Sequence, residues 1–180
     1  MGSVAAPLLA GFSLTLLGLI LQVQQHVRWP DLALLLLGLP VVAFLGSLQY
    51  AMRAQEFDVT PADASLWHPD LATSAERRDL VHEEIRAHRA AHVRWAARAR
   101  TLYNFGICFL LAGLAVMLVP PGTPTPVRWA AVGVVLAGLL GELGLMFAGW
   151  CLNGPLRDRL PAPLARFLWW IASADPLVRP

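Results

Sequence analysis

Four apolar stretches separated by polar segments dominate the pattern of the chain, at about 7–23, 31–52, 102–118 and 129–152. Each approaches or exceeds the roughly 20 apolar residues that a helix needs to cross a bilayer. The composition agrees, because 57% of the residues are hydrophobic and only 14% are charged, whereas soluble domains carry about 25% charged residues. The pattern predicts an all-α polytopic membrane protein with four transmembrane helices.

The third apolar stretch is predicted to be the end of a much longer helix that covers residues 73–118. This region contains no proline, and Thr73 with Glu76 has the spacing of a capping box. Residues 73–101 are largely good helix formers such as Ala, Arg, Glu and Leu. We therefore expect a helix that begins in water and ends in lipid, forming a long cytoplasmic extension of the third span.

These elements divide the chain into five predicted parts. They are a first transmembrane hairpin (1–54), a cytoplasmic linker (55–72), a cytoplasmic helical arm (73–101), a second transmembrane hairpin (102–154) and a cytoplasmic tail (155–180). The tail is expected to hold a C-terminal interfacial amphipathic helix, with apolar positions at Leu164, Phe167, Leu168 and Ile171. In the second span, Pro30 suits the first helical turn and Pro40 lies in the interior.

The arginines predict the orientation in the membrane. All 14 basic residues are Arg, which suggests a bacterial genome of high GC content. Only Arg28 and Arg128 lie in the two short turns between spans. The other twelve are Arg53 at the end of the first hairpin, seven in the arm and four in the tail. Basic residues are retained on the cytoplasmic side. We therefore expect a multi-pass protein of the inner (plasma) membrane, with both termini and the arm in the cytoplasm.

A heptad seam runs along the predicted arm. Its positions are spaced alternately four and three residues apart, as Val81, Ile85, His88, His92, Trp95, Ala99 and Leu102. Such a seam faces a partner helix. Two interpretations are open: the seam is buried against another copy of the chain, making a homo-oligomer, or it packs on the linker or tail of the same chain.

Glu84, His88 and His92 recur every four residues and so lie on one side of this helix. Two histidines at this spacing can share a metal ion, but the general-base Glu of the His-Glu-x-x-His motif is missing, and Arg89 and Arg94 disfavour a cation. The set is interpreted as structural or solvated histidines, as a pH-sensitive seam, or as a weak metal candidate. No metal is predicted.

Glu142 lies in the middle of the fourth apolar stretch. A carboxylate at that depth costs roughly 2.5 kcal/mol or more, and the spans hold no Arg, Lys or His at a matching depth. We expect either a hydroxyl partner, such as Ser13, Thr15 or Ser47, or a water-filled path. Glu142 is thus interpreted either as part of a proton, ion or ligand site, or as a structural residue that holds helices together by a hydrogen bond.

Small residues form a stripe on a different face of the fourth span, at Gly133, Ala137, Gly141, Gly144 and Ala148. Such stripes let membrane helices approach closely, and packing within the chain is the expected use.

The sequence contains no phosphate-binding glycine loop, no arrangement typical of a catalytic nucleophile and no paired-cysteine motif. We therefore predict no enzyme activity, no cofactor and no nucleic-acid partner. The expected function is that of a scaffold, sensor or accessory subunit in the lipid bilayer, assembling through its arm with another copy or with a membrane-protein partner. The alternative is an oligomeric proton- or ion-conducting channel that uses Glu142, with the His88/His92 seam sensing pH.

Overall fold

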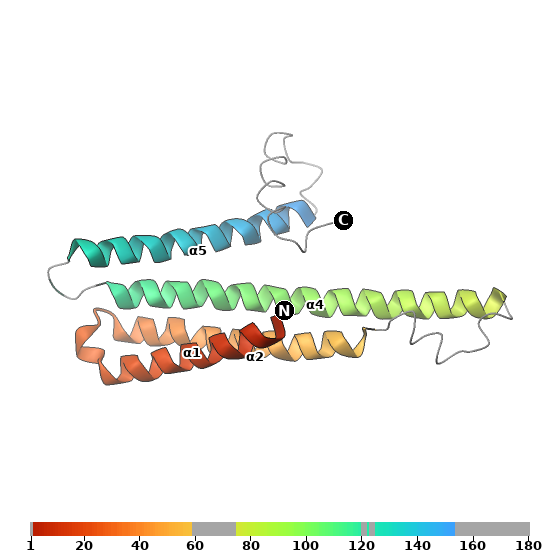
Figure 1. The fold of residues 1–180 in the computed structure, drawn as a ribbon, viewed down its shortest axis with the longest axis horizontal. Coiled ribbons are helices and arrows are strands. Elements are labelled where there is room, and N and C mark those ends of the chain that lie inside the picture. The colour runs from red at the N-terminus through yellow and green to blue at the C-terminus, as the bar shows by residue number, and fades with distance from the viewer. Residues whose placement is uncertain (1, 59–74, 120–121, 123–124, 154–180) are drawn as a thin grey trace. The chain divides into compact units, whose positions relative to one another are not determined.

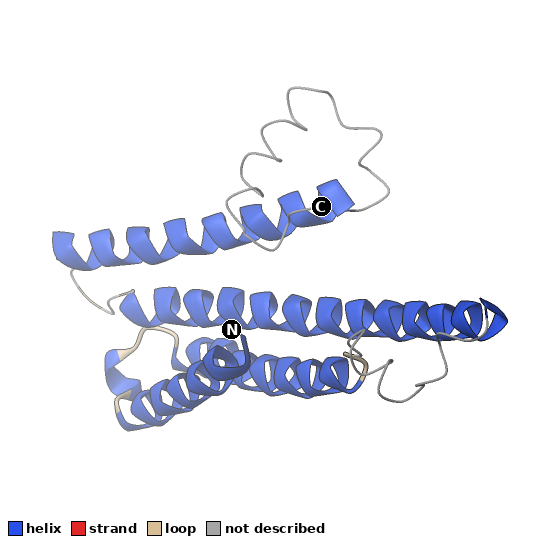
Figure 2. Cartoon of the chain, turned by 45° about the vertical axis from the view of Figure 1, so that its right-hand side comes forward, coloured by secondary structure: helices blue, strands red, loops and turns tan. Residues whose placement is uncertain are grey.

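The computed structural model describes residues 2–58, 75–119, 122 and 125–153, and this part of the chain is helical (Figure 1). Its elements are α1 (Gly2–Gln22), the short 3-10 helix η1 (Gln24–His26), α2 (Pro30–Glu56), α4 (Ala75–Leu118) and α5 (Pro126–Asn153). Figure 2 shows no strand in the described residues. The four α-helices are long and apolar enough to cross a membrane, which confirms the all-α prediction for the described residues and indicates a multi-pass membrane protein.

Proline sets several helix boundaries. α2 and α5 each begin with a proline at the first helical position, where the missing N–H is not needed. The Thr125 carbonyl accepts the N–H groups of Arg128 and Trp129 at the start of α5. α4 is one continuous helix of 44 residues that ends at Leu118, just before Val119 and Pro120, because the residue before a proline disfavours helical geometry.

Three helices, α1, α2 and α5, are longer than the pattern predicts, and α5 begins at Pro126 where residues 126–128 were expected in a turn. α1 begins at Gly2 and holds Pro7 in its interior; near the start of a helix this proline costs about one backbone hydrogen bond. α2 runs on to Glu56, four residues beyond the predicted end at residue 52, and continues through Pro40. The predicted cap at Thr73, most of the linker and the whole tail, with its interfacial helix, lie outside the described residues.

The chain divides into two compact units, and the division crosses helices rather than loops. Unit 1 holds the described residues of 1–15 and 38–106, and unit 2 holds those of 16–37 and 107–180. The predicted boundaries at 54, 72, 101 and 154 follow changes in polarity along the chain, and they stay predictions.

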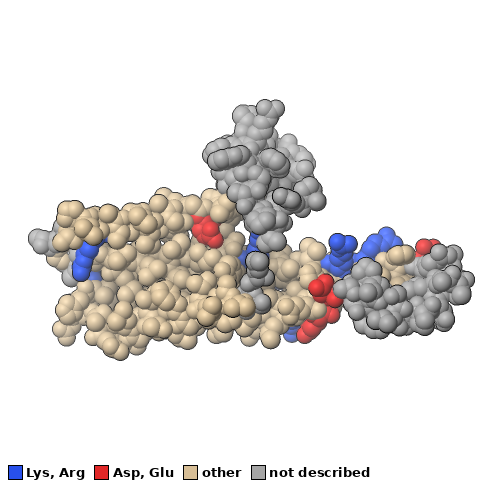
Figure 3. All heavy atoms as spheres, in the orientation of Figure 1, with Lys and Arg blue, Asp and Glu red and all other residues tan. Residues whose placement is uncertain are grey.

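In unit 1 the second half of α2 runs antiparallel to the first part of α4, since later residues of α2 meet earlier residues of α4. Phe44 lies against Tyr103, with ring centroids 5.7 Å apart. A Cβ added at Gly106 would stand 2.6 Å from the Phe44 ring, so only glycine leaves room for this aromatic side chain. Figure 3 shows charged atoms gathered beside the part of α4 that extends past the other helices. Arg86, Arg89 and Arg98 of α4 are exposed.

In unit 2 the start of α2, the end of α4 and α5 are joined by apolar and sulfur contacts. Leu37 fills the space beside Gly113, and Leu111 approaches Gly138. The Cys108 Sγ lies 3.7 Å from the Met146 Sδ. Only 6% of the apolar stretch of α5 is buried, so this helix makes little use of the rest of the described chain.

Candidate functional site

The heptad seam of α4 is covered by α2 of the same chain. The Ser47 hydroxyl donates to the Ala99 carbonyl at 2.8 Å, and both residues are buried. The His92 Nδ1 lies 2.9 Å from the Ala54 carbonyl oxygen. Because a carbonyl oxygen only accepts, Nδ1 carries the hydrogen. It gives the Ala54 carbonyl, near the C-terminal end of α2, a second donor beside the Phe57 N–H at 3.1 Å.

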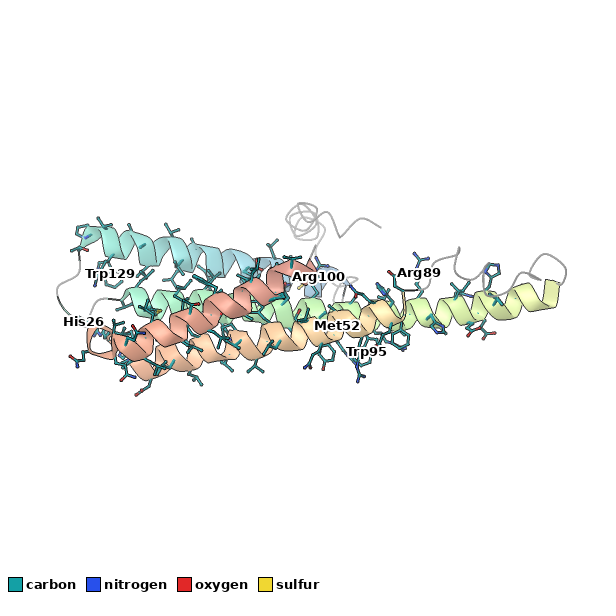
Figure 4. The ribbon with its side chains drawn as sticks, turned by 60° about the horizontal axis from the view of Figure 1, so that its bottom comes forward. His26, Met52, Arg89, Trp95, Arg100 and Trp129 are labelled. Atoms are coloured by element: carbon teal, nitrogen blue, oxygen red, sulfur yellow. The ribbon has the colours of Figure 1, made fainter. Side chains whose placement is uncertain are left out.

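Aromatic and apolar contacts continue this interface in both directions. The Trp95 ring stacks on Tyr50, with centroids 5.6 Å apart and an interplanar angle of 28°. Phe57, just beyond α2, lies 6.0 Å from the His88 ring. A Cβ at Gly46 would stand 3.0 Å from Leu102. Figure 4 shows Trp95 where the end of α2 runs beside α4.

Positions 88–102 of the seam therefore do not require a second copy of the chain. Val81 and Ile85 are half-buried and are the seam residues beyond this interface. The linker and tail were the expected partners within the chain: Phe57 of the predicted linker contacts His88, α2 contacts the seam from His92 to Leu102, and the tail lies outside the described residues. A signal for this lies in α2 itself, where buried or half-buried residues are spaced three and four apart: Leu37, Pro40, Phe44, Ser47, Ala51 and Ala54.

The structure does not bring Glu84, His88 and His92 together as a ligand set. The His88 Nδ1–H donates to the backbone carbonyl of Glu84 at 3.0 Å, and the Glu84 side chain is exposed. His92 instead reaches across to α2. Among the described residues, no group of three His, Cys, Asp or Glu side chains is placed to hold a metal ion.

Glu142 is half-buried in α5, and it forms no hydrogen bond with a described residue. The hydroxyls expected to serve it are used elsewhere. Ser13 donates to the Leu9 carbonyl and Thr15 to the Gly11 carbonyl, one turn back in α1, while Ser47 donates to Ala99. An ionised Glu142 therefore finds no donor among these three groups.

The small-residue stripe of α5 is open along most of its length. Gly133, Ala137, Gly141 and Gly144 are exposed, and only Ala148 is buried. A Cβ added at any of these three glycines would meet no atom within 4 Å. Within the described chain the stripe is not an internal packing surface.

One feature escaped the sequence analysis, a cluster of arginine and aromatic side chains around Trp95. The sequence spacing that indicates the cluster was present, because Arg53 follows Tyr50 and Arg98 follows Trp95 by three residues, about one helical turn.

Comparisons with protein-family models, curated proteins and solved structures found no match.

Proposed function

We propose that this chain is a non-enzymatic membrane protein of the bacterial inner (plasma) membrane that works as an accessory, scaffold or sensor subunit by binding another membrane helix through α5. One observation carries the proposal. Glu142 is a half-buried carboxylate without a hydrogen-bond partner among the described residues, in a helix whose neighbouring face of small residues is exposed.

The depth of Glu142 makes this arrangement costly for an isolated chain. Fourteen residues separate it from Arg128, and eleven separate it from Asn153, or about 21 Å and 17 Å along the helix. The side chain thus lies near the middle of a bilayer about 30 Å thick, where an acidic residue costs roughly 2.5 kcal/mol or more. A partner helix that donates a hydrogen bond to Glu142 would offset this cost.

The exposed stripe suits such a partner. Glycine and alanine let two helix backbones approach closely, and close packing drives association where lipid removes the hydrophobic driving force. The arm was the surface first expected to assemble, but α2 and Phe57 cover its seam from His88 to Leu102. We therefore place the assembly surface on α5, with either a second copy or another membrane protein as the partner.

The same observation supports a second candidate function. If copies meet through α5, their Glu142 side chains lie near a shared interface, and the assembly becomes a proton- or ion-conducting channel. A His88/His92 seam between copies has less support, because these two histidines contact Phe57 and Ala54 of the same chain.

The native mass of the detergent-purified protein, with variants of Glu142, tests the proposal. We expect wild type to exceed the monomer mass or to retain a membrane partner, Glu142→Gln to keep most of the association, and Glu142→Leu to lose it. Leu136→Ala is the matched control, since Leu136 is 42% exposed and lies about 120° around the helix from Glu142 and about 100° from the centre of the small-residue stripe. A native mass that shows wild type as a monomer without a bound partner would contradict the proposal.

Flux into reconstituted liposomes separates the two candidate functions. A channel predicts a wild-type flux of protons or cations that Glu142→Gln abolishes without loss of assembly. If wild type carries no flux under a pH gradient or a membrane potential, the channel is excluded and Glu142 is left with its role in assembly.

The orientation is proposed from the arginine distribution, with both termini and the region of residues 55–100 cytoplasmic. Single cysteines at positions 64 and 122 of a variant without Cys108 and Cys151 can be labelled from outside the cell. We expect labelling at 122 and not at 64, and the reverse pattern would invert the proposed topology.

A further inference from the structure

Two guanidinium groups from different helices lie over one indole ring. The guanidinium carbon of Arg98 in α4 is 4.6 Å from the centroid of Trp95, and that of Arg53 in α2 is 5.5 Å from it. Tyr50 stacks on the same indole. These four residues, here called the Trp95 cluster, join the end of α2 to α4 within unit 1 (Figure 4).

The cluster presents positive charge without a counter-ion from the described chain. Arg53 and Arg98 are both exposed, and neither forms an ion pair with a described residue. Glu56 lies one turn beyond Arg53 and is itself exposed, while Arg94 adds a further exposed positive charge beside Trp95. Each guanidinium retains several N–H donors for a ligand, because the aromatic face engages the group without using them.

The position of the cluster along the helices matches the headgroup level of a bilayer. No charged residue occurs from 32 to 52 in α2 or from 101 to 119 in and just after α4. These stretches span about 32 Å and 28 Å as helix, close to the hydrocarbon thickness of about 30 Å. Arg53 and Arg98 stand just outside them, and Trp and Tyr favour this same boundary.

We propose that the Trp95 cluster binds the phosphate of an anionic phospholipid in the leaflet at this end of α2 and α4. A phosphate accepts paired N–H donors from arginine and relieves the repulsion between two cations held on one ring. A headgroup that carries its own ammonium brings a like charge to the arginines, so an anionic headgroup is preferred over a zwitterionic one. The acyl chains have exposed apolar side chains of α2 to lie along, among them Leu45 and Met52. The inference does not depend on the proposed function.

Lipid titration followed by native mass spectrometry of the full-length protein in detergent tests this inference. The probes are phosphatidylglycerol and phosphatidylcholine with identical acyl chains. We expect wild type to bind phosphatidylglycerol more tightly, and the double variant Arg53→Gln/Arg98→Gln to lose about tenfold in that affinity with phosphatidylcholine binding unchanged. The double variant Arg53→Lys/Arg98→Lys keeps the charge and should retain part of the preference.

Two single variants serve as matched controls. Arg28 also lies over an indole, that of Trp29, at 4.9 Å, but with only one guanidinium. Arg89 is exposed on α4 before the cluster. Arg28→Gln and Arg89→Gln should each leave the phosphatidylglycerol preference intact. Equal affinity of wild type for both lipids, an unchanged preference in the Arg53→Gln/Arg98→Gln variant, or the same loss in both controls would overturn the assignment.

Discussion

α2 and α5 have nearly the same length, 27 and 28 residues, and both are apolar enough to cross a membrane. Yet 33% of the apolar stretch of α2 is buried, against 6% in α5. Apolar character selects the segments that enter lipid, but it does not select the ones that pack together, because lipid tails are as apolar as leucine. Shape and polar contacts have to make that choice.

Shape complementarity distinguishes the two helices. Along α2 a large side chain meets a glycine of α4 twice, with Phe44 beside Gly106 and Leu37 beside Gly113. Along α5 the glycines of the small-residue stripe meet no described atom. The α2–α4 pair is therefore completed inside the chain, whereas α5 offers the same kind of small-residue surface to something else.

Trimming the largest buried side chain should have the largest effect. Phe44 is 1% exposed, and Phe44→Ala leaves a cavity over Gly106. We expect a loss of about 2–4 kcal/mol in the free energy of unfolding in detergent, below the usual range for soluble cores because lipid weakens the transfer contribution. Phe147→Ala in α5, where the side chain is 57% exposed, should cost less than about 1.5 kcal/mol, mainly its ring contact with Trp150. Equal losses of stability in Phe44→Ala and Phe147→Ala would show that α2 and α5 do not differ in how tightly they pack.

Adding one methyl group should change the free energy of unfolding differently at a glycine of α4 and at a glycine of α5. Gly106→Ala places a Cβ 2.6 Å from the Phe44 ring, and this overpacking should cost about 1–3 kcal/mol. Gly133→Ala meets open space and should be neutral or stabilising by up to about 1 kcal/mol, since alanine favours helix. Thermal unfolding followed by circular dichroism measures both variants. A Gly106→Ala protein as stable as wild type would show that the helices can separate without cost.

Removing the side chain of His92 should test how far the α2–α4 pair extends beyond the apolar stretches. His92→Ala leaves the Ala54 carbonyl without its side-chain donor, at a cost of about 1 kcal/mol. Hydrogen exchange should show faster opening of the amides near the end of α2. His88→Ala removes a bond within α4 only and should leave those amides protected. Identical exchange in the two variants would mean that the His92 bond does not stabilise the end of α2.

Removing the Ser47 hydroxyl, which lies between α2 and α4, should have the smallest effect on the free energy of unfolding. Ser47→Ala removes the bond to the Ala99 carbonyl, for which about 0.6 kcal/mol is typical in a membrane. Ser13→Ala, whose hydroxyl bonds its own helix one turn back, should cost less. A double-mutant cycle of Ser47→Ala with Gly46→Ala should show coupling, because both changes act on one interface, and additive losses would argue against a shared contact.

Much of the fold follows from local pattern. The four spanning segments, the proline start of α2, and the continuity of α4 across the change from charged to apolar residues were predictable, because each depends on backbone preference or on transfer into lipid. The start of α5 at Pro126 was not predicted, since the span was expected to begin at about 129. The candidate site was harder to predict from the sequence. His88 and His92 share a helix face in the sequence, but which carbonyl each nitrogen meets depends on a residue 38 positions away for His92 and on the adjacent turn for His88.

The amino-acid order was enough to predict long helices, four of them suited to a membrane, and a carboxylate midway along the last one. Packing between helices was needed to show that α2 and Phe57 cover positions 88–102 of the heptad seam, that Arg53 and Arg98 lie over Trp95, and that the stripe of α5 is open. Helix formation and lipid compatibility are properties of a segment, whereas the choice of packing partner depends on the shapes of two surfaces, such as Phe44 and Gly106, that are far apart in the chain.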